Sequence, residues 1–136
     1  MQTSEATWTR AEATRWAHEL YGGAVDRKDA AGFAAVLTDD AWLRFGNAEP
    51  IIGRAAIEAA IAQFFTAFVA LRHEFTGVSP CGDTLFLEAT VTYTRHDGGL
   101  VTVPAMTVFH MTETSGRRLA DRCQMYVDLT PLFAAE

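Results

Sequence analysis

Three side chains in this sequence have types and positions suited to acid–base chemistry: the carboxylate of Asp26, the imidazole of His73 and the phenol of Tyr21. Asp26 lies in the stretch YGGAVDRKDAAGF, five residues after Tyr21, where the apolar face of a first helix should point inward. A carboxylate that accepts a hydrogen bond from an imidazole N–H fixes the tautomer of the ring and raises its basicity. The free ring nitrogen can then remove a proton next to a carbonyl, and a phenol can donate to the developing enolate.

Each of these residues also has a purely structural interpretation. Asp26 can cap the turn that follows it by accepting hydrogen bonds from backbone amides near Lys28 and Asp29. His73 can be a partly exposed residue at the start of a strand, and Tyr21 can belong to the core. The residues alone leave both interpretations open.

Helical patterns dominate the first half of the chain. Thr9 and Glu12 have the spacing of a capping box, and apolar residues recur at helical spacing from there to about Asp26. Asp29 can cap a short second helix over 30–37. The segment DDAWLRF is then predicted to be a strand, and a broad apolar face predicts a third helix over residues 54 to 70.

Strand patterns dominate the second half. Four alternating segments rich in Val, Thr, Phe and Tyr follow Leu71 and are separated by turns at PCGD, HDGG and ETSG. Three helices and one early strand before a four-stranded meander predict a single α+β domain over residues 1–136. The segment VPAMTVFHM is apolar on both faces, so the sheet must be covered on both sides. We therefore expect a homodimer through the outer sheet face, with contacts at residues such as Val91, Tyr93, Val108 and His110.

Composition excludes several classes of function. The chain has 136 residues, 49% of them hydrophobic, and a net charge of −6 without any Lys/Arg cluster, which argues against nucleic-acid binding. No apolar run is long enough to cross a membrane, and MQTSEATWTR lacks the apolar core of a signal peptide. Cys81 and Cys123 lie far apart without a CxxC motif, so we expect no metal site. A soluble cytoplasmic protein with free thiols is the expectation.

Four motifs, in this order, resemble the nuclear-transport-factor-2-like (SnoaL-like) superfamily. They are VDRKDAAGFAAVLTDDA, IIGRAAIEAAIAQFF, RHEFTGVSPCGDTLFLEATVTYTR and RCQMYVDLTPLF, and the resemblance extends from Trp8 to Leu132. The superfamily includes ketosteroid isomerase, scytalone dehydratase, limonene epoxide hydrolase and the SnoaL polyketide cyclases. The resemblance implies a cystatin-like cone, in which three N-terminal helices lie against a curved, mainly antiparallel sheet and enclose one pocket. Since this fold hosts many chemistries, the reaction must be argued from the site.

The resemblance also gives roles to individual positions. Asp26 matches the helix-one aspartate of scytalone dehydratase, and His73 falls at or next to a catalytic histidine of that enzyme. Tyr21 falls where ketosteroid isomerase has its oxyanion-hole tyrosine. Phe45, however, replaces the general base of that isomerase, and about Thr107 is the position of its acidic hydrogen-bond donor.

The likeness to limonene epoxide hydrolase excludes one reaction. Its Asp–Arg–Asp arrangement falls at Thr92, Thr90 and Met125, so hydrolysis by that route is excluded. The side chains expected to contact substrate are Trp16, Phe45, Asn47, Phe64, Thr90, Thr92, Thr107 and Met125.

These observations predict an enzyme that uses neither cofactor nor metal. A neutral His73 is expected to act as the base, oriented by Asp26 within one cavity, with Tyr21 as hydrogen-bond donor. The expected substrate is a hydrophobic cyclic small molecule, and the reaction is of the dehydratase, isomerase or cyclase type. The alternative is a non-catalytic small-molecule binding protein of the same fold, which the loss of most family catalytic residues favours. A third possibility is a module that only dimerises.

Overall fold

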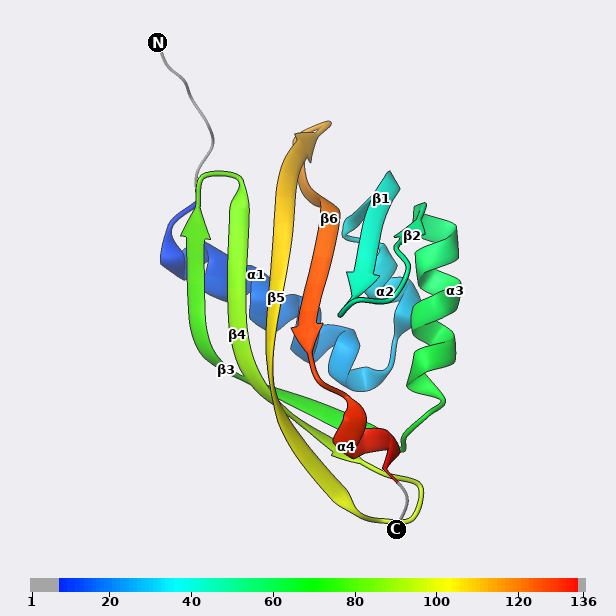
Figure 1. The fold of residues 1–136 in the computed structure, drawn as a ribbon. Coiled ribbons are helices and arrows are strands. Elements are labelled where there is room, and N and C mark those ends of the chain that lie inside the picture. The colour runs from blue at the N-terminus through cyan, green and yellow to red at the C-terminus, as the bar shows by residue number, and fades with distance from the viewer. Residues whose placement is uncertain (1–7, 135–136) are drawn as a thin grey trace.

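The protein, described by a computed structural model for residues 8–134, combines helices with one curved sheet (Figure 1). The helical elements are α1 (Arg10–Gly23), the single 3₁₀ turn η1 (Val25–Arg27), α2 (Ala30–Ala34), α3 (Arg54–Phe65) and α4 (Thr130–Phe133). The strands are β1 (Leu37–Phe45), β2 (Ile51–Ile52), β3 (Ala70–Cys81), β4 (Thr84–Thr94), β5 (Leu100–Thr114) and β6 (Arg117–Val127).

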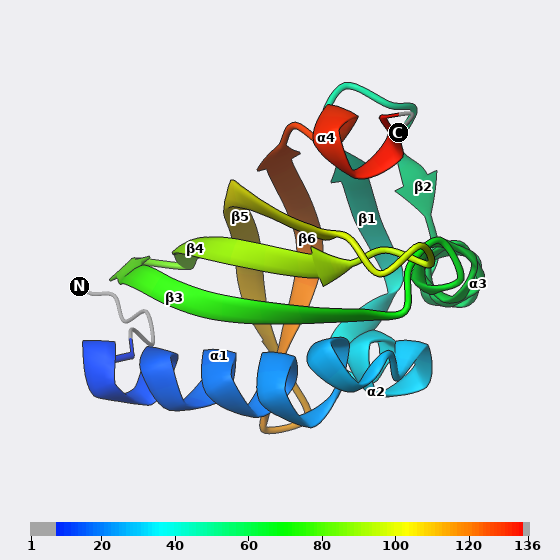
Figure 2. The same ribbon diagram turned by 90° about the horizontal axis from the view of Figure 1, so that it is seen from below.

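The six strands form one open, mixed sheet in the order β2-β1-β6-β5-β4-β3. Strands β3 to β6 pair antiparallel with their sequence neighbours, whereas β1 runs parallel to β6. A bulge on β3 shifts its register against β4 between Phe75 and Gly77, and a bulge on β6 at Asp121 shifts its register against β5. Bulges increase local twist, which accounts for part of the strong curvature seen in Figure 2. Strand β3 lies at one edge of the sheet, so its backbone has a strand partner on one side only.

The start of α1 follows the predicted capping box. The Thr9 hydroxyl accepts from the Glu12 amide at 3.1 Å, and the Glu12 carboxylate accepts from the Thr9 amide at 2.8 Å. The helix ends at Gly23, before Asp26, because the chain tightens into the 3₁₀ turn η1. Asp29 caps α2 by accepting from Gly32, as predicted, but α2 ends at Ala34 because β1 begins at Leu37 and pairs with β6.

The end of α3 also differs from the sequence-based expectation. The helix stops at Phe65 rather than near residue 70. The Val69 amide donates to Thr94 on β4, and the fully buried Phe68 ring packs 4.9 Å from Tyr93. Pairing with β4 therefore converts the last predicted helical turn into the approach to β3.

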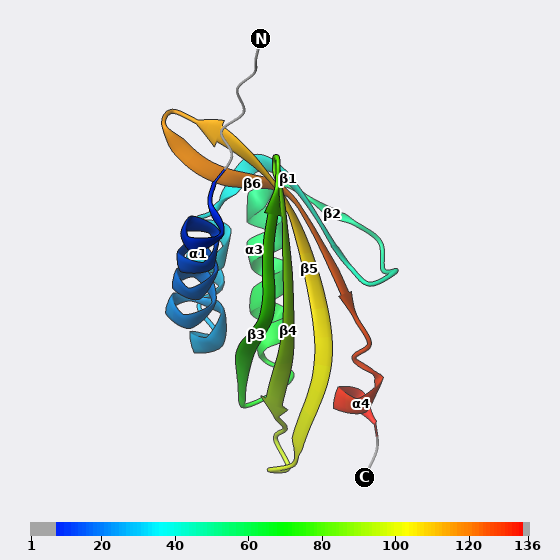
Figure 3. The same cartoon turned by 90° about the vertical axis from the view of Figure 1, so that its left-hand side faces the viewer.

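Helices α1, α2 and α3 lie on one face of the sheet, which we call the inner face. Figure 3 shows α1 and α3 on the same side of the strands, and α1 lies along β3 in Figure 2. The inner face carries fully buried side chains such as Leu87, Val91 and Phe109. The opposite, outer face carries the half-buried side chain of Val108 and the exposed side chain of His110.

Several details of the expected cone are corrected. The expected single early strand is two strands, β1 and β2, which separate α2 from α3. The sheet is curved but unclosed, and more open hollows accompany the cavity between the sheet and the helices. Val91 and Tyr93 face inward with 1% and 4% exposure, so they are wrong as dimer contacts.

Two expectations from the sequence concern a membrane-spanning segment and a signal peptide. Within residues 8–134, no helix is both long and apolar enough to cross a bilayer. The expectation about a signal peptide falls largely on residues 1–7, outside the described residues.

Candidate functional site

The turn that carries Asp26 is fixed by contacts of its own backbone. The amides of Lys28 and Asp29 donate to the carbonyls of Val25 and Ala24, both at 2.9 Å. These are the amides that a capping Asp26 would have to bind, so the capping interpretation is wrong. The Asp26 carboxylate is thereby free to reach another element.

Lys28 then ties this turn to the start of β3. Its backbone adopts the left-handed conformation, with φ +60°, which reverses the chain after η1. Its ammonium donates to the carbonyls of Phe68 and Val69 at 2.8 and 3.1 Å. An ammonium that bridges two carbonyls of the segment leading into β3 holds η1 against that strand.

Asp26 makes two hydrogen bonds to one residue. Its Oδ2 accepts from the backbone N–H of His73 at 2.9 Å, and its Oδ1 lies 2.7 Å from His73 Nδ1. The backbone N–H is available because β3 is an edge strand, with a neighbour on one side only. Because an ionised carboxylate can only accept, Nδ1 carries the proton in this pair. The Asp26 side chain is 17% exposed and the His73 side chain 13% exposed, so the pair is largely screened from water.

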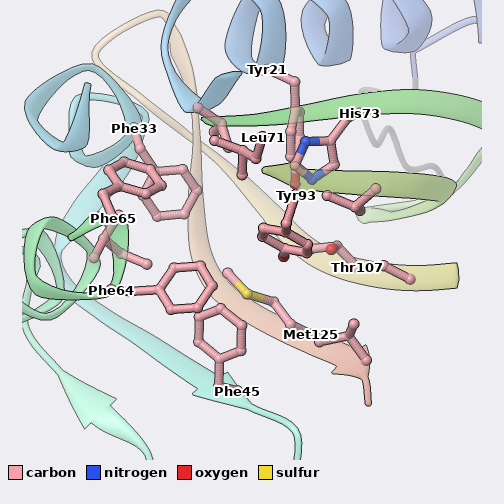
Figure 4. A pocket seen from close by; sticks show the side chains of 15 residues that line it. Tyr21, Phe33, Phe45, Phe64, Phe65, Leu71, His73, Tyr93, Thr107 and Met125 are labelled. Atoms are coloured by element: carbon pink, nitrogen blue, oxygen red, sulfur yellow. The ribbon is translucent and has the colours of Figure 1, made fainter. Parts of the chain in front are cut away.

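The second ring nitrogen of His73 faces a cavity. His73 lines that cavity, and Figure 4 shows one of its two ring nitrogens directed toward Tyr93. The nitrogen beside Asp26 is Nδ1, which leaves Nε2 for the cavity. No residue in the described range 8–134 hydrogen-bonds this Nε2. With the proton held on Nδ1, Nε2 presents a lone pair to the cavity, which is the arrangement a general base requires.

Three hydroxyl groups share the cavity with His73. They belong to Tyr21, Tyr93 and Thr107, and the Tyr21 ring centre lies 4.6 Å from that of His73. Burial, followed by the charge of Cys123, raises the pKa of Tyr21 well above its usual range, while a hydrogen bond with Thr107 acts in the opposite direction. Burial and then the charge of Asp26 raise the pKa of Tyr93 to about 12. Both phenols are therefore protonated at neutral pH and can donate.

The rest of the cavity is apolar and small. Its other lining residues are Val25, Phe33, Phe45, Ile61, Phe64, Phe65, Leu71, Val91, Ala105, Met125 and Val127. The volume of the cavity is about 60 Å³, well below the roughly 300–1,000 Å³ of ordinary ligand pockets. Side chains such as Phe45 and Phe64, whose ring centres are 5.0 Å apart, occupy much of the space between sheet and helices. The site is thus one polar corner within an apolar enclosure.

Sequence comparison identifies the family. A family model for the SnoaL-like domain matches residues 17–118. The chain belongs to the SnoaL-like domain family. No curated protein matches this SnoaL-like chain in sequence.

Several solved structures have the same fold as this chain, and they are named after different enzymes. A proposed aromatic ring hydroxylase from Novosphingobium aromaticivorans is 26% identical, with a TM-score of 0.70 over 90% of this chain and 95% of the other. A proposed SnoaL-like polyketide cyclase from Jannaschia sp. CCS1 is 19% identical, with a TM-score of 0.74 over 100% and 99%. An LEH-like epoxide hydrolase of M. tuberculosis is 20% identical, with a TM-score of 0.68 over 90% and 87%. These names indicate small-molecule enzymes but several reactions, so the site must decide the chemistry.

Half of the expected substrate contacts of the SnoaL-like chain line the cavity. Phe45, Phe64, Thr107 and Met125 do so, together with His73 and Tyr21. Asp26 itself does not: it lines a groove on the other side of β3 and reaches the cavity only through the His73 ring. The expectation that Asp26 and His73 line one cavity is corrected accordingly.

The other four expected contacts lie elsewhere. Thr90 and Thr92 point to the outer face, since they alternate with the buried residues of β4, and the Thr92 hydroxyl bonds that of Thr102 at 3.0 Å. Trp16 packs edge-on against Phe109, away from the cavity, with ring centres 5.3 Å apart. Asn47 follows the end of β1 and lines an open hollow beside the cavity.

Two residues of the SnoaL-like site were missed in the sequence analysis. Tyr93 was placed on the outer face, although its alternation with Leu87, Ala89 and Val91 put it on the most apolar side of β4. That alternation was the signal that could have found it. Lys28 had no such signal, because its role depends on a left-handed turn and on carbonyls 40 and 41 residues away.

The other histidines, all within residues 8–134, lie away from the cavity. His96 donates to the Thr66 carbonyl at 2.9 Å, and His18 stacks edge-on with Phe75 on the exposed side of α1. His110 pairs with Asp121 at 2.7 Å on the outer face. No group of three or more His, Cys, Asp or Glu side chains within residues 8–134 is arranged to hold a metal ion.

Proposed function

We propose that this SnoaL-like chain is an acid–base enzyme that acts on a carbonyl-bearing hydrophobic small molecule. The observation that carries the proposal is the His73 ring, held by Asp26 through Nδ1 at 2.7 Å while Nε2 faces a largely apolar cavity. A base in such surroundings acts without competition from bulk water. The phenols of Tyr21 and Tyr93 supply donors in the same cavity.

The first step is proton removal. His73 Nε2 takes a proton from the carbon next to the carbonyl, and the C–H electron pair forms an enolate whose oxygen accepts hydrogen bonds from Tyr21 or Tyr93. Asp26 accepts from Nδ1–H throughout and stabilises the imidazolium that forms. Asp26 is therefore a positioning residue, and His73 is the catalytic base.

The imidazolium then determines the product. Returning the proton to another carbon of the dienolate gives an isomer, and returning it to a β-hydroxyl releases water and gives an enone. If the enolate carbon attacks a second carbonyl of the same molecule, the imidazolium protonates the new alkoxide and a ring forms. These are the isomerase, dehydratase and cyclase reactions, and all three share the first step.

The shared first step can be tested without knowing the natural substrate. Butanone and benzylacetone would be incubated with the protein in deuterated water, and proton NMR would follow the loss of the α-protons. We expect exchange above the buffer rate, reduced on the order of 100-fold by His73→Gln, the usual scale for general-base assistance. His110→Gln is the matched control, because His110 also lies 2.7 Å from an aspartate but faces outward.

Two outcomes would contradict the proposal. Equal losses in His73→Gln and His110→Gln would show that exchange is not catalysed in the cavity. Binding of the ketones without exchange above the buffer rate would favour the non-catalytic binding protein, for which the predominance of apolar lining residues is the supporting observation.

We also propose that a second copy of the chain covers the outer sheet face. Phe86 and Tyr126 on that face are 38% and 57% exposed, and Met106 and Val108 between them are half-buried. A band of apolar side chains across three neighbouring strands is typical of a subunit contact.

A further inference from the structure

An open hollow adjoins the cavity and shares part of its wall. The hollow has a volume of about 610 Å³ and lies where β1 and β6 end, beside α4. Phe45, Phe64 and Val127 line both spaces. The other residues of the hollow are Gly46, Asn47, Ala48, Asp128, Leu129, Thr130, Phe133 and Ala134. The contact between the two phenylalanine rings, with centres 5.0 Å apart, therefore separates the cavity from the hollow.

The two volumes restrict what can bind. An apolar cavity of about 150 Å³ holds a benzene ring. The cavity beside His73, at about 60 Å³, has less than half of that volume, so it suits a small group such as the methyl ketone end of a molecule. The hollow falls within the size range of ordinary ligand pockets. A substrate with a ring can thus place its reacting end beside His73 only if its ring lies in the hollow. Rotation of the Phe45 or Phe64 ring toward the open hollow would let the linking chain pass.

The side chains of the hollow indicate the chemistry of that ring. Phe133, 60% exposed, and the shared phenylalanines offer apolar surface for stacking. Asp128 Oδ1 accepts from the Thr130 amide at 3.0 Å, and hydrogen bonds from Thr130 lower the pKa of this carboxyl. Its other oxygen can accept from a ligand hydroxyl. Among residues 8–134, no Lys or Arg side chain lines the hollow, whereas the Asp128 carboxylate does. The Arg44 guanidinium at its rim donates to the Ala48 carbonyl at 3.0 Å, so the lining favours an uncharged ligand.

We propose that the hollow binds the non-reacting part of the substrate, and that the substrate is an uncharged, hydroxylated aryl ketone whose carbonyl end enters the cavity. The identity of the reacting end rests on the proposed function. The binding site in the hollow rests on the shared wall, the two volumes and the Asp128 and Phe133 side chains, and is independent of catalysis.

The test compares three probes by NMR titration of the full chain: butanone, benzylacetone and para-hydroxybenzylacetone. Butanone is the reacting end alone, benzylacetone adds the ring, and the third probe adds the hydroxyl. We expect affinity to rise in that order. Phe133→Ala should reduce the advantage of both aryl ketones over butanone by about fivefold, the scale of one aromatic contact. Asp128→Ala should remove the advantage of the hydroxylated probe over benzylacetone.

Matched controls come from the outer face, where Phe86→Ala and Asp121→Ala should leave all three affinities in the same ratio. The inference is overturned if benzylacetone binds no better than butanone, or if neither Phe133→Ala nor Asp128→Ala changes the ratios. A different result would contradict the proposed function: an α-proton exchange rate that is the same in His73→Gln as in the wild type. Binding that depends on the hollow without such exchange would leave the hollow as a ligand site and remove only the catalytic proposal.

Discussion

Substituting Asp26 by Asn tests the central interaction of the site with a change of a few atoms. Asp26 accepts two hydrogen bonds from His73, one from the backbone N–H and one from Nδ1–H. Asparagine keeps one oxygen and replaces the other with an NH₂ group, which cannot accept. If NH₂ faces Nδ1, that nitrogen must become the acceptor, and the proton moves to Nε2. If NH₂ faces the backbone N–H, two donors oppose each other.

Both outcomes have measurable sizes. Moving the proton to Nε2 removes the base from the cavity, so α-proton exchange of butanone should fall by a factor on the order of 100. Losing one charge-assisted hydrogen bond in a largely buried pair should lower the free energy of unfolding by about 1–3 kcal/mol. For a chain of this length, each kcal/mol lowers the melting temperature by about 3–5 °C. The fold itself should persist.

The assay combines three measurements on the same variant. Exchange of butanone α-protons gives the rate, urea unfolding gives the stability, and nitrogen NMR of the His73 ring gives the tautomer. Asp121→Asn is the control, since it alters a histidine–carboxylate pair of the same length on the outer face. The reasoning is refuted if Asp26→Asn lowers stability while the exchange rate stays at the wild-type value. In that case Asp26 would only fasten η1 to β3.

Three further predictions concern the cavity wall and the assembly. The pKa of Tyr93 is raised from 10.0 to about 12, so the folded chain keeps a proton that the unfolded chain releases above pH 10. Stability should therefore fall between pH 10 and about 12, by about 1.4 kcal/mol per pH unit for this group, and urea unfolding of Tyr93→Phe should show a slope shallower by that amount; equal slopes would contradict it. Phe45→Ala should join the cavity to the hollow, so that benzene raises the melting temperature of this variant by more than that of wild type or of the outer-face variant Phe86→Ala. The substitution should cost about 1–3 kcal/mol, less than for a fully buried phenylalanine. Sedimentation should show a dimer at micromolar concentration and a monomer for Val108→Arg; a wild-type monomer would exclude the proposed interface.

Local physical chemistry made part of this structure predictable. The capping box at Thr9 and Glu12 and the Asp29 cap depend on side-chain and backbone groups three residues apart, so the sequence contains all the information they need. Alternation on β4 likewise separates Glu88 and Thr90 from Ala89 and Val91, because successive side chains of a strand point to opposite faces.

Boundaries were less predictable where long-range pairing overrides helical periodicity. The sequence pattern continues the third helix to about residue 70, but hydrogen bonding of Val69 to Thr94 ends it at Phe65. Similarly, strand β1 begins at Leu37, inside the predicted second helix, because it pairs with β6 at Ala120. In both cases the partner lies more than twenty residues away along the chain, so a local pattern does not contain it.

The candidate site shows the same division. The sequence by itself determined that the chain carries a carboxylate, an imidazole and phenols on elements of an α+β fold, because residue type and local periodicity suffice for that. Only the tertiary structure decided that Asp26 meets His73 across 47 residues, and that the face of β4 with Tyr93, rather than the face with Thr92, lines the cavity. Those facts depend on a left-handed turn at Lys28, on the free edge of β3 and on which face of the sheet the helices cover. The volume left between the packed side chains is likewise a property of the whole core, to which many residues contribute at once.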